Sequence, residues 1–312
     1  MSITLQINGR TIQAESGQTI LQAARTHEIY IPTLCDMPEL APHGSCRMCI
    51  VEVEGRPNTP TACTTLVSDG MVVHTETAQV RELRKEILRM LLADHPTSCL
   101  FCPEGGNCEE CMVTLHKSGV TTGCRTCPSD GQCSLQQLVS DYEIQSVGYP
   151  VRYRGLEVKK EDPFFDRDNN LCILCGRCVN VCASLHFNPV QVYVKRGSHT
   201  QVGTGFDSSH LEAGCSFCGA CLDACPTGAL SEKTRKWDGK PDAAISSFCS
   251  FCSLGCEVSL QIKRDPAEMI LGAVPATPDE NLCVKGRFGV TELVNHPQRL
   301  SGVLQVEAGQ AV

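Results

Sequence analysis

The 23 cysteines of this chain fall into groups with short, repeated spacings, and this spacing constrains the fold more than any other feature. Thiolates at intervals of two or three residues are typical metal ligands, and runs this dense favour iron–sulfur clusters. No cysteine is left over, and His95, at ligand spacing before one group, adds a further donor. The groups are Cys35, Cys46, Cys49 and Cys63; Cys99, Cys102, Cys108, Cys111, Cys124, Cys127 and Cys133; Cys172, Cys175, Cys178 and Cys182; Cys215, Cys218, Cys221 and Cys225; and Cys249, Cys252, Cys256 and Cys283.

Two other uses of dense cysteine fit the sequence less well. A disulfide framework belongs to short secreted chains, and the opening segment MSITLQINGR lacks the apolar stretch of a signal peptide. Structural zinc modules pair two Cys-x2-Cys units across a loop, whereas residues 172–182 hold four cysteines in one short run. The pattern therefore favours a row of iron–sulfur centres that transfers electrons over a zinc-stabilised scaffold.

Composition limits the partners and the location of the chain. A net charge of −8 argues against nucleic-acid binding, and no run of 18 apolar residues is present that could span a membrane. Many of the residues counted as hydrophobic are cysteines, so we expect small apolar cores in which the clusters supply much of the cross-linking. Numerous thiolates imply a reducing compartment, so we expect a cytoplasmic protein, with a place at the periphery of a membrane complex left open.

Residues 1–78 have the pattern of a small sheet followed by a cysteine loop. Residues 3–7 alternate as a strand, Asn8-Gly9 marks a hairpin turn, and residues 11–14 form the return strand. Residues 19–27 predict a helix, because their apolar side chains share one side, and residues 50–54 predict a further strand. The four cysteines of this region follow the spacing Cys-x10-Cys-x2-Cys-x13-Cys.

This order and spacing resemble the N-terminal domain of the large iron–sulfur subunit of respiratory complex I and of the related NAD-linked formate dehydrogenases and iron hydrogenases. The resemblance implies a β-grasp ferredoxin domain with one [2Fe–2S] cluster bound by Cys35, Cys46, Cys49 and Cys63. The spacing differs from the Cys-x4-Cys-x2-Cys of plant-type ferredoxins. Gly44 and Ser45 suit such a loop, because a tight backbone lets N–H groups point at the sulfurs.

Residues 79–147 predict a helix followed by a mixed histidine and cysteine site. Apolar side chains at helical spacing mark the helix over residues 80–92. The segment after it has the spacing His-x3-Cys-x2-Cys-x5-Cys, which matches the histidine-ligated [4Fe–4S] motif of the same family. A neutral imidazole in place of a thiolate makes a cluster less negative and should raise its reduction potential.

A near repeat, Cys124-x2-Cys127-x5-Cys133, gives this region enough ligands for a second [4Fe–4S] cluster, and two partitions are open. The first groups His95 with Cys99, Cys102 and Cys108, and Cys111 with Cys124, Cys127 and Cys133. The second groups Cys99, Cys102, Cys108 and Cys111, and His95 with Cys124, Cys127 and Cys133. We favour the first, because His95 lies close in sequence to its set. The second has some support, because the ending Cys133-Ser-Leu-Gln resembles the family's histidine-cluster motif.

Residues 148–240 contain two runs of the bacterial two-cluster ferredoxin type, each with the spacing Cys-x2-Cys-x2-Cys-x3-Cys. In this pattern the fourth cysteine of each run binds the cluster of the other run. One [4Fe–4S] cluster is therefore predicted on Cys172, Cys175, Cys178 and Cys225, and another on Cys215, Cys218, Cys221 and Cys182. This crossing ties both halves of the module together. The locally basic segment 151–160 is interpreted as a solvated linker.

Residues 241–312 contain the spacing Cys-x2-Cys-x3-Cys-x26-Cys, followed by Val284-Lys285-Gly286-Arg287. This resembles the [4Fe–4S] motif at the start of molybdenum or tungsten bis-pterin oxidoreductases. The resemblance implies a cluster on Cys249, Cys252, Cys256 and Cys283, and a cofactor-binding Lys285 between that cluster and a pterin. Residues 257–263 predict a strand. The pterin-binding catalytic domains of those enzymes are not expected in this chain.

The whole sequence predicts an α+β protein with four domains, 1–78, 79–147, 148–240 and 241–312. The expected cofactors are one [2Fe–2S] cluster and five [4Fe–4S] clusters, one of them histidine-ligated. The favoured function is an electron-transfer subunit that relays electrons between a flavin subunit binding NAD(P)H and another redox or catalytic subunit. An alternative is the electron-input part of a molybdenum or tungsten formate dehydrogenase whose catalytic portion is separate. No catalytic residue is predicted in this chain.

Overall fold

The computed structural model describes residues 2–38, 40–102, 108, 121–185, 189–264, 269–277 and 280–299, and the short strands at 306–307 and 310–311. The chain forms two compact units, and each is described by itself. The first comprises Met1–Cys215 and Ala220–Gly239, and the second comprises Ser216–Gly219 and Lys240–Val312. None of the helices in the described ranges has the length and apolar character needed to cross a membrane.

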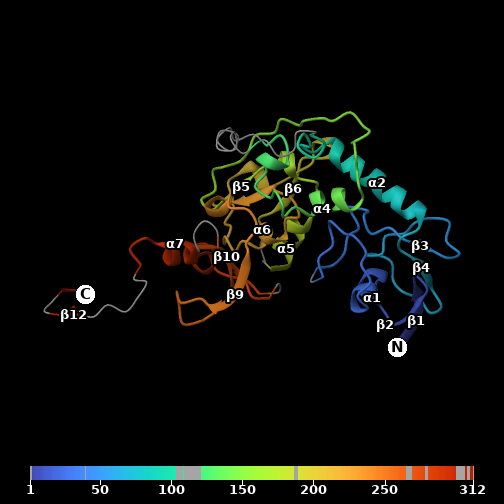
Figure 1. Cartoon of the computed structure of the whole chain (residues 1–312), viewed down its shortest axis with the longest axis horizontal. Coiled ribbons are helices and arrows are strands. Elements are labelled where there is room, and N and C mark those ends of the chain that lie inside the picture. The colour runs from blue at the N-terminus through green and yellow to red at the C-terminus, as the bar shows by residue number, and fades with distance from the viewer. Residues whose placement is uncertain are drawn as a thin grey trace. The chain divides into compact units, whose positions relative to one another are not determined.

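The first unit begins with a four-stranded sheet in the order β2-β1-β4-β3. The predicted hairpin is confirmed, because β1 (Ser2–Ile7) pairs antiparallel with β2 (Arg10–Glu15). β1 also pairs in parallel with β4 (Val72–His74), which pairs antiparallel with β3 (Glu52–Val53) (Figure 1). The strand expected over residues 50–54 is therefore shorter than the sequence indicated.

Helix α1 (Ile20–Thr26) packs its apolar side into the core of this sheet. Thr19 and Gln22 form a capping box, in which each side chain bonds the backbone N–H of the other, so the helix begins where the sequence predicts. Ile20 and Leu21 are buried with residues of β1 and β2. Each such side chain stabilises the fold by roughly 1.5–3 kcal/mol, so residues 1–78 have an apolar core of their own.

Helix α2 (Ala78–Ala93) confirms the helix predicted over residues 80–92. Its buried Leu88 and Leu92 belong to one apolar cluster with Leu135 of α4 (Ser134–Asp141). The cluster also contains the side chains of Cys35 and Cys46. The helix therefore forms part of the packing around the cysteine loop of the first sheet.

The remainder of the first unit consists of short elements in paired sets. Strand β5 (Phe165–Arg167) pairs with β8 (Leu230–Glu232), β6 (Val192–Val194) pairs with β7 (Gln201–Gly203), and both pairings are antiparallel. Helices α5 (Arg177–Leu185) and α6 (Ala220–Ala224) pack against each other. Single turns of 3-10 helix connect them at Cys124–Thr126, Asn169–Leu171, Gly197–His199, Gly205–Asp207 and Lys233–Arg235.

The second unit contains a three-stranded antiparallel sheet in the order β11-β10-β9. The strand predicted over residues 257–263 is confirmed as β10 (Glu257–Lys263), which lies between β9 (Ala243–Phe248) and β11 (Met269–Pro275). A π-helical turn, η7 (Lys285–Gly289), leads into α7 (Val290–Asn295). Strands β12 (Val306–Glu307) and β13 (Gln310–Ala311) form a separate small hairpin. The mixture of helices and sheets in both units agrees with the predicted α+β content.

Candidate iron–sulfur sites

The four cysteines of the first sheet domain lie together in its interior. Cys35, Cys46, Cys49 and Cys63 are all buried thiols. The backbone N–H of Cys46 donates to Cys35 Sγ at 3.4 Å, and that of Leu34 donates to Cys46 Sγ at 3.4 Å. Backbone donors directed at sulfur are what a thiolate-ligated cluster requires.

Their side chains form two contacting pairs, which the pKa values reflect. A hydrogen bond from the Cys46 side chain lowers the pKa of Cys35 to about 5, and the same contact raises the pKa of Cys46. Cys63 likewise lowers the pKa of Cys49 and has its own pKa raised. One thiol of each pair therefore ionises readily. This arrangement fits a [2Fe–2S] cluster, in which two thiolates bind each iron.

The loop that presents these thiols needs glycine at one position. Gly44 has a φ of +67°, and a Cβ placed on it would lie 3.2 Å from Thr64 Cγ2. Arg47, three residues further on, has a φ of 61°. Two left-handed residues therefore turn the chain around Cys46, which is the tight backbone that the sequence predicts here.

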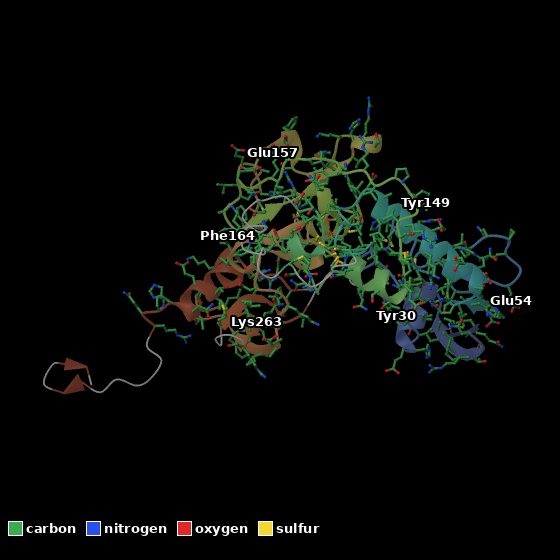
Figure 2. All side chains as sticks on the ribbon, turned by 45° about the horizontal axis from the view of Figure 1, so that its top comes forward. Tyr30, Glu54, Tyr149, Glu157, Phe164 and Lys263 are labelled. Carbon is green, nitrogen blue, oxygen red and sulfur yellow. The ribbon has the colours of Figure 1, made fainter. Side chains whose placement is uncertain are left out.

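In the ferredoxin-like module, one cavity is lined by Cys172, Cys175, Cys178 and Cys225. Three of these cysteines come from one run, and Cys225 is the fourth cysteine of the other run. Sulfur atoms lie among the ribbons of the first unit (Figure 2). The structure thus brings together the four residues that the crossed pattern predicts for one cluster.

The two cysteine runs share a backbone conformation as well as a spacing. In the first, Leu174 and Gly176 have φ values of 53° and 79°. In the second, Phe217 and Gly219, at the equivalent positions, have φ values of 51° and 81°. The first loop directs the Leu174 N–H at Cys172 Sγ at 3.4 Å. The repeated turn indicates that both runs are built to wrap a cluster.

Burial makes these thiols hold their protons when no cluster is bound. It raises the pKa of Cys172 to about 11 and that of Cys175 to about 12, and it also raises the pKa of Cys178 well above its usual value. A second contribution is the charge of Cys225, which lies close to all three. Iron binding must displace these protons, so filling the site is coupled to proton release.

The structure groups His95 differently from the partition that the sequence favours. His95 lines a second cavity together with Cys124, Cys127 and Cys133. Sequence proximity to Cys99 suggested the other grouping. However, the segment around Thr122 folds back against Ser98, whose N–H and hydroxyl both donate to the Thr122 carbonyl.

The His95 ring is oriented as a metal ligand would be. It is 8% exposed, and its Nδ1 lies 3.1 Å from the Pro96 carbonyl, so that nitrogen donates its proton there. Its Nε2 is buried and makes no hydrogen bond among the described residues, although the backbone of Leu171 lies near enough to the ring to oppose the effect of burial on its pKa. Burial lowers the pKa of His95, which keeps the imidazole neutral. A neutral ring held through Nδ1 leaves the Nε2 lone pair for a metal.

The remaining thiols of this region are only partly described. Cys99 packs so closely against Gly123 that a Cβ at Gly123 would lie 2.5 Å from Cys99 Sγ. Cys102 is exposed and Cys108 is half-buried. Cys111 lies outside the described residues. The grouping of these four cysteines therefore rests on sequence.

Contacts on two sides join the cavity of Cys172, Cys175, Cys178 and Cys225 to the Cys46 loop and to the His95 site. His43 Nε2 lies 2.7 Å from the Cys175 carbonyl, and the Ser45 hydroxyl donates to the same oxygen at 3.2 Å. On the other side, the Ser134 N–H donates to the Pro226 carbonyl at 2.9 Å. The cavity of Cys172, Cys175, Cys178 and Cys225 thus lies between the other two sites. Sequence reasoning assigned no role to His43, although its place three residues before Cys46 was a signal.

In the second unit, Cys249 is buried and Cys256 is half-buried, whereas Cys252 and Cys283 are exposed. The Cys249 N–H donates to the Cys256 carbonyl at 2.8 Å, which closes the loop between them. Gly286 packs against Cys249, because a Cβ there would lie 3.4 Å from its Sγ. Lys285 is exposed at the start of η7. The structure therefore gives Lys285 an accessible ammonium close in sequence to Cys283.

Sequence reasoning named Arg287 in the segment after Cys283 but gave it no role. Its side chain is fully buried, and its Nη1 donates to the Ala273 carbonyl at 2.9 Å. Its backbone N–H donates to the Cys283 carbonyl at 2.9 Å. Arg287 therefore fixes the last cysteine of the motif to β11. Its position four residues after Cys283 was the only signal in the sequence.

Among the described residues, no three His, Cys, Asp or Glu side chains meet as they would around a single metal ion. The thiols instead surround spaces, as the two cavities show. A multi-iron cluster distributes its ligands over several irons, so its protein ligands are spread more widely than those of one ion. The buried thiols, the unpartnered His95 Nε2 and the cavities all fit iron–sulfur clusters.

Comparison with known families agrees with this class of site. Residues 1–78 match a "2Fe-2S iron-sulfur cluster binding domain", residues 84–109 an "NADH-ubiquinone oxidoreductase-G iron-sulfur binding region", and residues 171–229 a "4Fe-4S dicluster domain". The chain is therefore an iron–sulfur protein with both [2Fe–2S] and [4Fe–4S] domains.

Curated relatives narrow the class further. The chain is 33% identical over 302 residues to "NADPH-Fe(3+) oxidoreductase subunit alpha" of Geobacter sulfurreducens, covering 96% of this chain and 32% of the relative. It is 30% identical to "NADH-ubiquinone oxidoreductase 78 kDa subunit, mitochondrial" of Candida albicans, covering 77% and 30%. It is 36% identical to "NADP-reducing hydrogenase subunit HndD" of Solidesulfovibrio fructosivorans, covering 76% and 37%. The chain is thus a homologue of the large iron–sulfur subunits of NAD(P)H-linked oxidoreductases, and it spans about a third of their length.

A solved structure shows a similar fold. A chain of the "NAD+-reducing [NiFe]-hydrogenase in the H2-reduced state" matches with a TM-score of 0.57 and 26% identity. The match covers 75% of this chain and 88% of that chain. It agrees with the resemblance that the cysteine spacing predicts.

Proposed function

We propose that this chain is an electron-transfer subunit that relays single electrons through a series of iron–sulfur clusters. The observation that supports this most directly is the cavity lined by Cys172, Cys175, Cys178 and Cys225, with other cysteine sites bonded to it on two sides. When bound, the clusters supply one-electron redox chemistry. The residues of this chain hold them, shield them from water and set their spacing.

The proposed [2Fe–2S] ligands are Cys35, Cys46, Cys49 and Cys63, in a domain over residues 1–78. The proposed [4Fe–4S] sets are His95, Cys124, Cys127 and Cys133; Cys99, Cys102, Cys108 and Cys111; Cys172, Cys175, Cys178 and Cys225; Cys182, Cys215, Cys218 and Cys221; and Cys249, Cys252, Cys256 and Cys283. These sets occupy proposed domains 79–147, 148–240 and 241–312. The count is one [2Fe–2S] cluster and five [4Fe–4S] clusters.

The geometry supports an order for part of the relay. The loop of Cys46 touches the carbonyl of Cys175 through Ser45 and His43, so the [2Fe–2S] site adjoins the cluster on Cys172, Cys175, Cys178 and Cys225. That site in turn adjoins the His95 site, because the N–H of Ser134, next to Cys133, donates to the carbonyl of Pro226, next to Cys225, at 2.9 Å. Electrons would therefore pass between the [2Fe–2S] and His95 sites through the site that lies between them.

The partners follow from the chemistry of electron donors. An iron–sulfur cluster accepts one electron, whereas NAD(P)H gives a hydride, so a cofactor that handles both, such as a flavin, must lie on another subunit. We propose a flavin subunit that binds NAD(P)H and a further redox or catalytic subunit as partners. The names of the relatives, which include NADH-ubiquinone, NADPH-Fe(3+) and NADP-reducing enzymes, support this.

An alternative proposal is the electron-input part of a pterin-dependent formate dehydrogenase. The second unit favours it, because Cys249, Cys252, Cys256 and Cys283 are followed by the accessible Lys285. In this case the unit would adjoin a molybdenum or tungsten pterin on a separate catalytic portion. Co-purification of the native complex and its metal content distinguish the two, since only the alternative requires molybdenum or tungsten.

Spectroscopy of the pure chain tests the main proposal. Protein purified without oxygen should be brown, should bleach with dithionite, and should give electron paramagnetic resonance signals of reduced [2Fe–2S] and [4Fe–4S] clusters. NADH, NADPH or formate should not reduce it without partner subunits. A colourless protein that contains zinc would instead support a zinc-stabilised scaffold and contradict the relay.

A further inference from the structure

A buried arginine lies beside the cavity of Cys172, Cys175, Cys178 and Cys225. Arg167 is 4% exposed and lines that cavity. Its backbone is fixed on both sides, because it pairs with Leu230 of β8 and bonds Lys159 through its N–H and carbonyl. Its Nη1 lies against β7, 3.8 Å from where a Cβ of Gly203 would be. The side chain is thus held in the wall of the cavity.

Within the described residues, this guanidinium lacks the partners that a buried cation needs. Its Nε and Nη1 are buried and have no hydrogen-bond partner. The two carboxylates adjacent in sequence have other partners: Asp166 lies 2.8 Å from Lys236, and Asp168 accepts from the Asn170 side chain at 2.8 Å. An unpaired buried charge is strongly destabilising, so an anion close to these two nitrogen atoms would stabilise the buried position of Arg167.

A second arginine belongs to the cysteine loop itself. Arg177 lies between Cys175 and Cys178, and its Nε is also buried with no hydrogen-bond partner in the part of the chain that the structure describes. Its charge contributes to lowering the pKa of Cys175, against the larger effect of burial. Arg167 of β5 therefore lines the cavity, and Arg177, at the start of α5, acts electrostatically on Cys175, one of the cysteines in its wall.

We propose that Arg167 and Arg177 are the counter-charges of the [4Fe–4S] cluster held in this cavity and that they raise its reduction potential. The inference rests on the proposed ligand set. A cluster with four thiolates has a net charge of roughly −2 when oxidised and −3 when reduced. Reduction adds one electron, delivered by the adjoining [2Fe–2S] cluster or by dithionite, and no bond or proton changes. Nearby cations stabilise the more negative state, so they favour the reduced form.

The two arginines affect where electrons are held along the proposed relay. The cavity adjoins both the [2Fe–2S] site and the His95 site, so its cluster is the middle one of the three. The two arginines therefore stabilise the reduced state of this middle cluster. The His95 site differs, because Asp130 lines its cavity and contributes to raising the pKa of Cys124 and Cys127. The wall of the His95 cavity thus contains a carboxylate, which pairs with Arg125 at 3.5 Å, whereas the wall of the middle cavity contains the guanidinium of Arg167.

Redox titration of the full chain, followed by electron paramagnetic resonance, tests the proposal. The signal of the middle cluster is assigned as the one whose shape changes in Cys175→Ser. Arg167→Gln and Arg177→Gln should each reduce the equilibrium constant for its reduction at least tenfold, a shift of about 59 mV for one electron. Arg177→Lys should recover most of the loss, and Arg196→Gln, at an exposed position in the same module, should change nothing.

Iron and sulfide content separates failure of the inference from failure of the proposed function. Wild-type protein that cannot be loaded with iron would overturn the ligand set and the inference together. Variants with wild-type iron content and an unchanged midpoint would leave the ligand set intact and show that the arginines do not tune the cluster. If Arg167→Gln loses iron because the buried position does not tolerate glutamine, the midpoint of Arg177→Gln, at a half-buried position, decides whether the arginines tune the cluster.

Discussion

At the scale of single residues, His95 shows how a fold can place a side chain beside cysteines that are distant in sequence. Its Nε2 has no partner among the described residues, its Nδ1 faces the Pro96 carbonyl, and it shares a cavity with Cys124, Cys127 and Cys133. The spacing His-x3-Cys-x2-Cys predicted a ligand, and the ring geometry supports that role. The match of residues 84–109 to an iron–sulfur binding region also supports a ligand role for His95, but this range contains Cys99, Cys102 and Cys108 and ends before Cys124.

Replacing His95 by cysteine should keep one [4Fe–4S] cluster but lower its potential, because a thiolate adds a negative charge where imidazole adds none. Redox-titrated electron paramagnetic resonance measures this directly. The Cys124→Ser variant should disturb the same signal, whereas Cys102→Ser should not if our grouping is right. An unchanged spectrum in His95→Ala would show that His95 is not a ligand.

Arg84 is a second residue whose role becomes visible only in three dimensions. Its fully buried guanidinium donates to the Ile50 carbonyl at 2.8 Å, to the Tyr142 hydroxyl at 2.9 Å and to Glu76 at 2.6 Å. It therefore joins α2 to the cysteine loop and to the end of α4. In the sequence it looks like an ordinary polar residue of a surface helix.

Arg84→Met should destabilise the protein by about 3 kcal/mol, since it leaves buried acceptors without a donor. Arg81→Met on the same helix is the matched control. Arg81 also pairs with Glu76, but its side chain is 43% exposed, so its loss should cost less than about 1 kcal/mol. Urea unfolding of both variants under identical iron loading compares them. Equal losses would contradict the bridging role of Arg84.

At the scale of elements, the contact between the loop of Cys46 and the loop of Cys175 fixes the distance between two clusters. His43 touches the Cys175 carbonyl and receives a contact from Asn180 at 3.0 Å, so it connects the sheet domain to α5. A Cβ at Gly176 would lie 2.9 Å from His43 Nε2. The two loops are therefore in close packing at this point.

His43→Ala should slow electron exchange between the [2Fe–2S] cluster and its neighbour by about tenfold, because the bridging contact is lost. Both clusters should still assemble with unchanged midpoints. Rapid-mixing reduction with freeze-quenched electron paramagnetic resonance measures the rate. His43→Gln, which can still bond the carbonyl, should restore most of it. Wild-type rates in His43→Ala would rule out a role for this contact.

Sequence alone predicted the elements with strong local signals. The hairpin around Asn8-Gly9 and helix α2 came from periodicity and turn chemistry, which act within a few residues. The crossing of Cys225 into the first cysteine run was also predictable, because the spacing belongs to a known pattern. The grouping of His95 and the buried arginines were not, since both depend on segments far apart in sequence that fold together.

Loss of the clusters should affect these elements unequally. Residues 1–78 have an apolar core of β1, β2 and α1, whereas the short elements around residues 165–232 surround cysteine cavities. Iron removal should therefore unfold residues 165–232 before residues 1–78, since metal binding contributes to the folding of residues 165–232. Limited trypsin digestion of the iron-free chain should cut at Lys159, Lys160 and Arg177 before it cuts within residues 1–78. Equal protection of both regions would contradict this.

At the scale of the whole molecule, the chain is a homologue of iron–sulfur subunits and spans about a third of their length. Its contribution, as proposed, is to hold several one-electron centres within reach of one another. The first unit contains the contacts that order three of them. The second unit offers two exposed cysteines of its motif, Cys252 and Cys283, and the exposed Lys285, which suits contact with the proposed further redox partner.

Iron and sulfide analysis of the anaerobically reconstituted chain tests the central claim most directly. One [2Fe–2S] and five [4Fe–4S] clusters require about 22 irons per chain with a matching amount of sulfide. A value of about 18 would remove one [4Fe–4S] cluster from the region of residues 95–133 but keep the relay. A chain that folds without iron and sulfide, or that binds only zinc, would contradict the account.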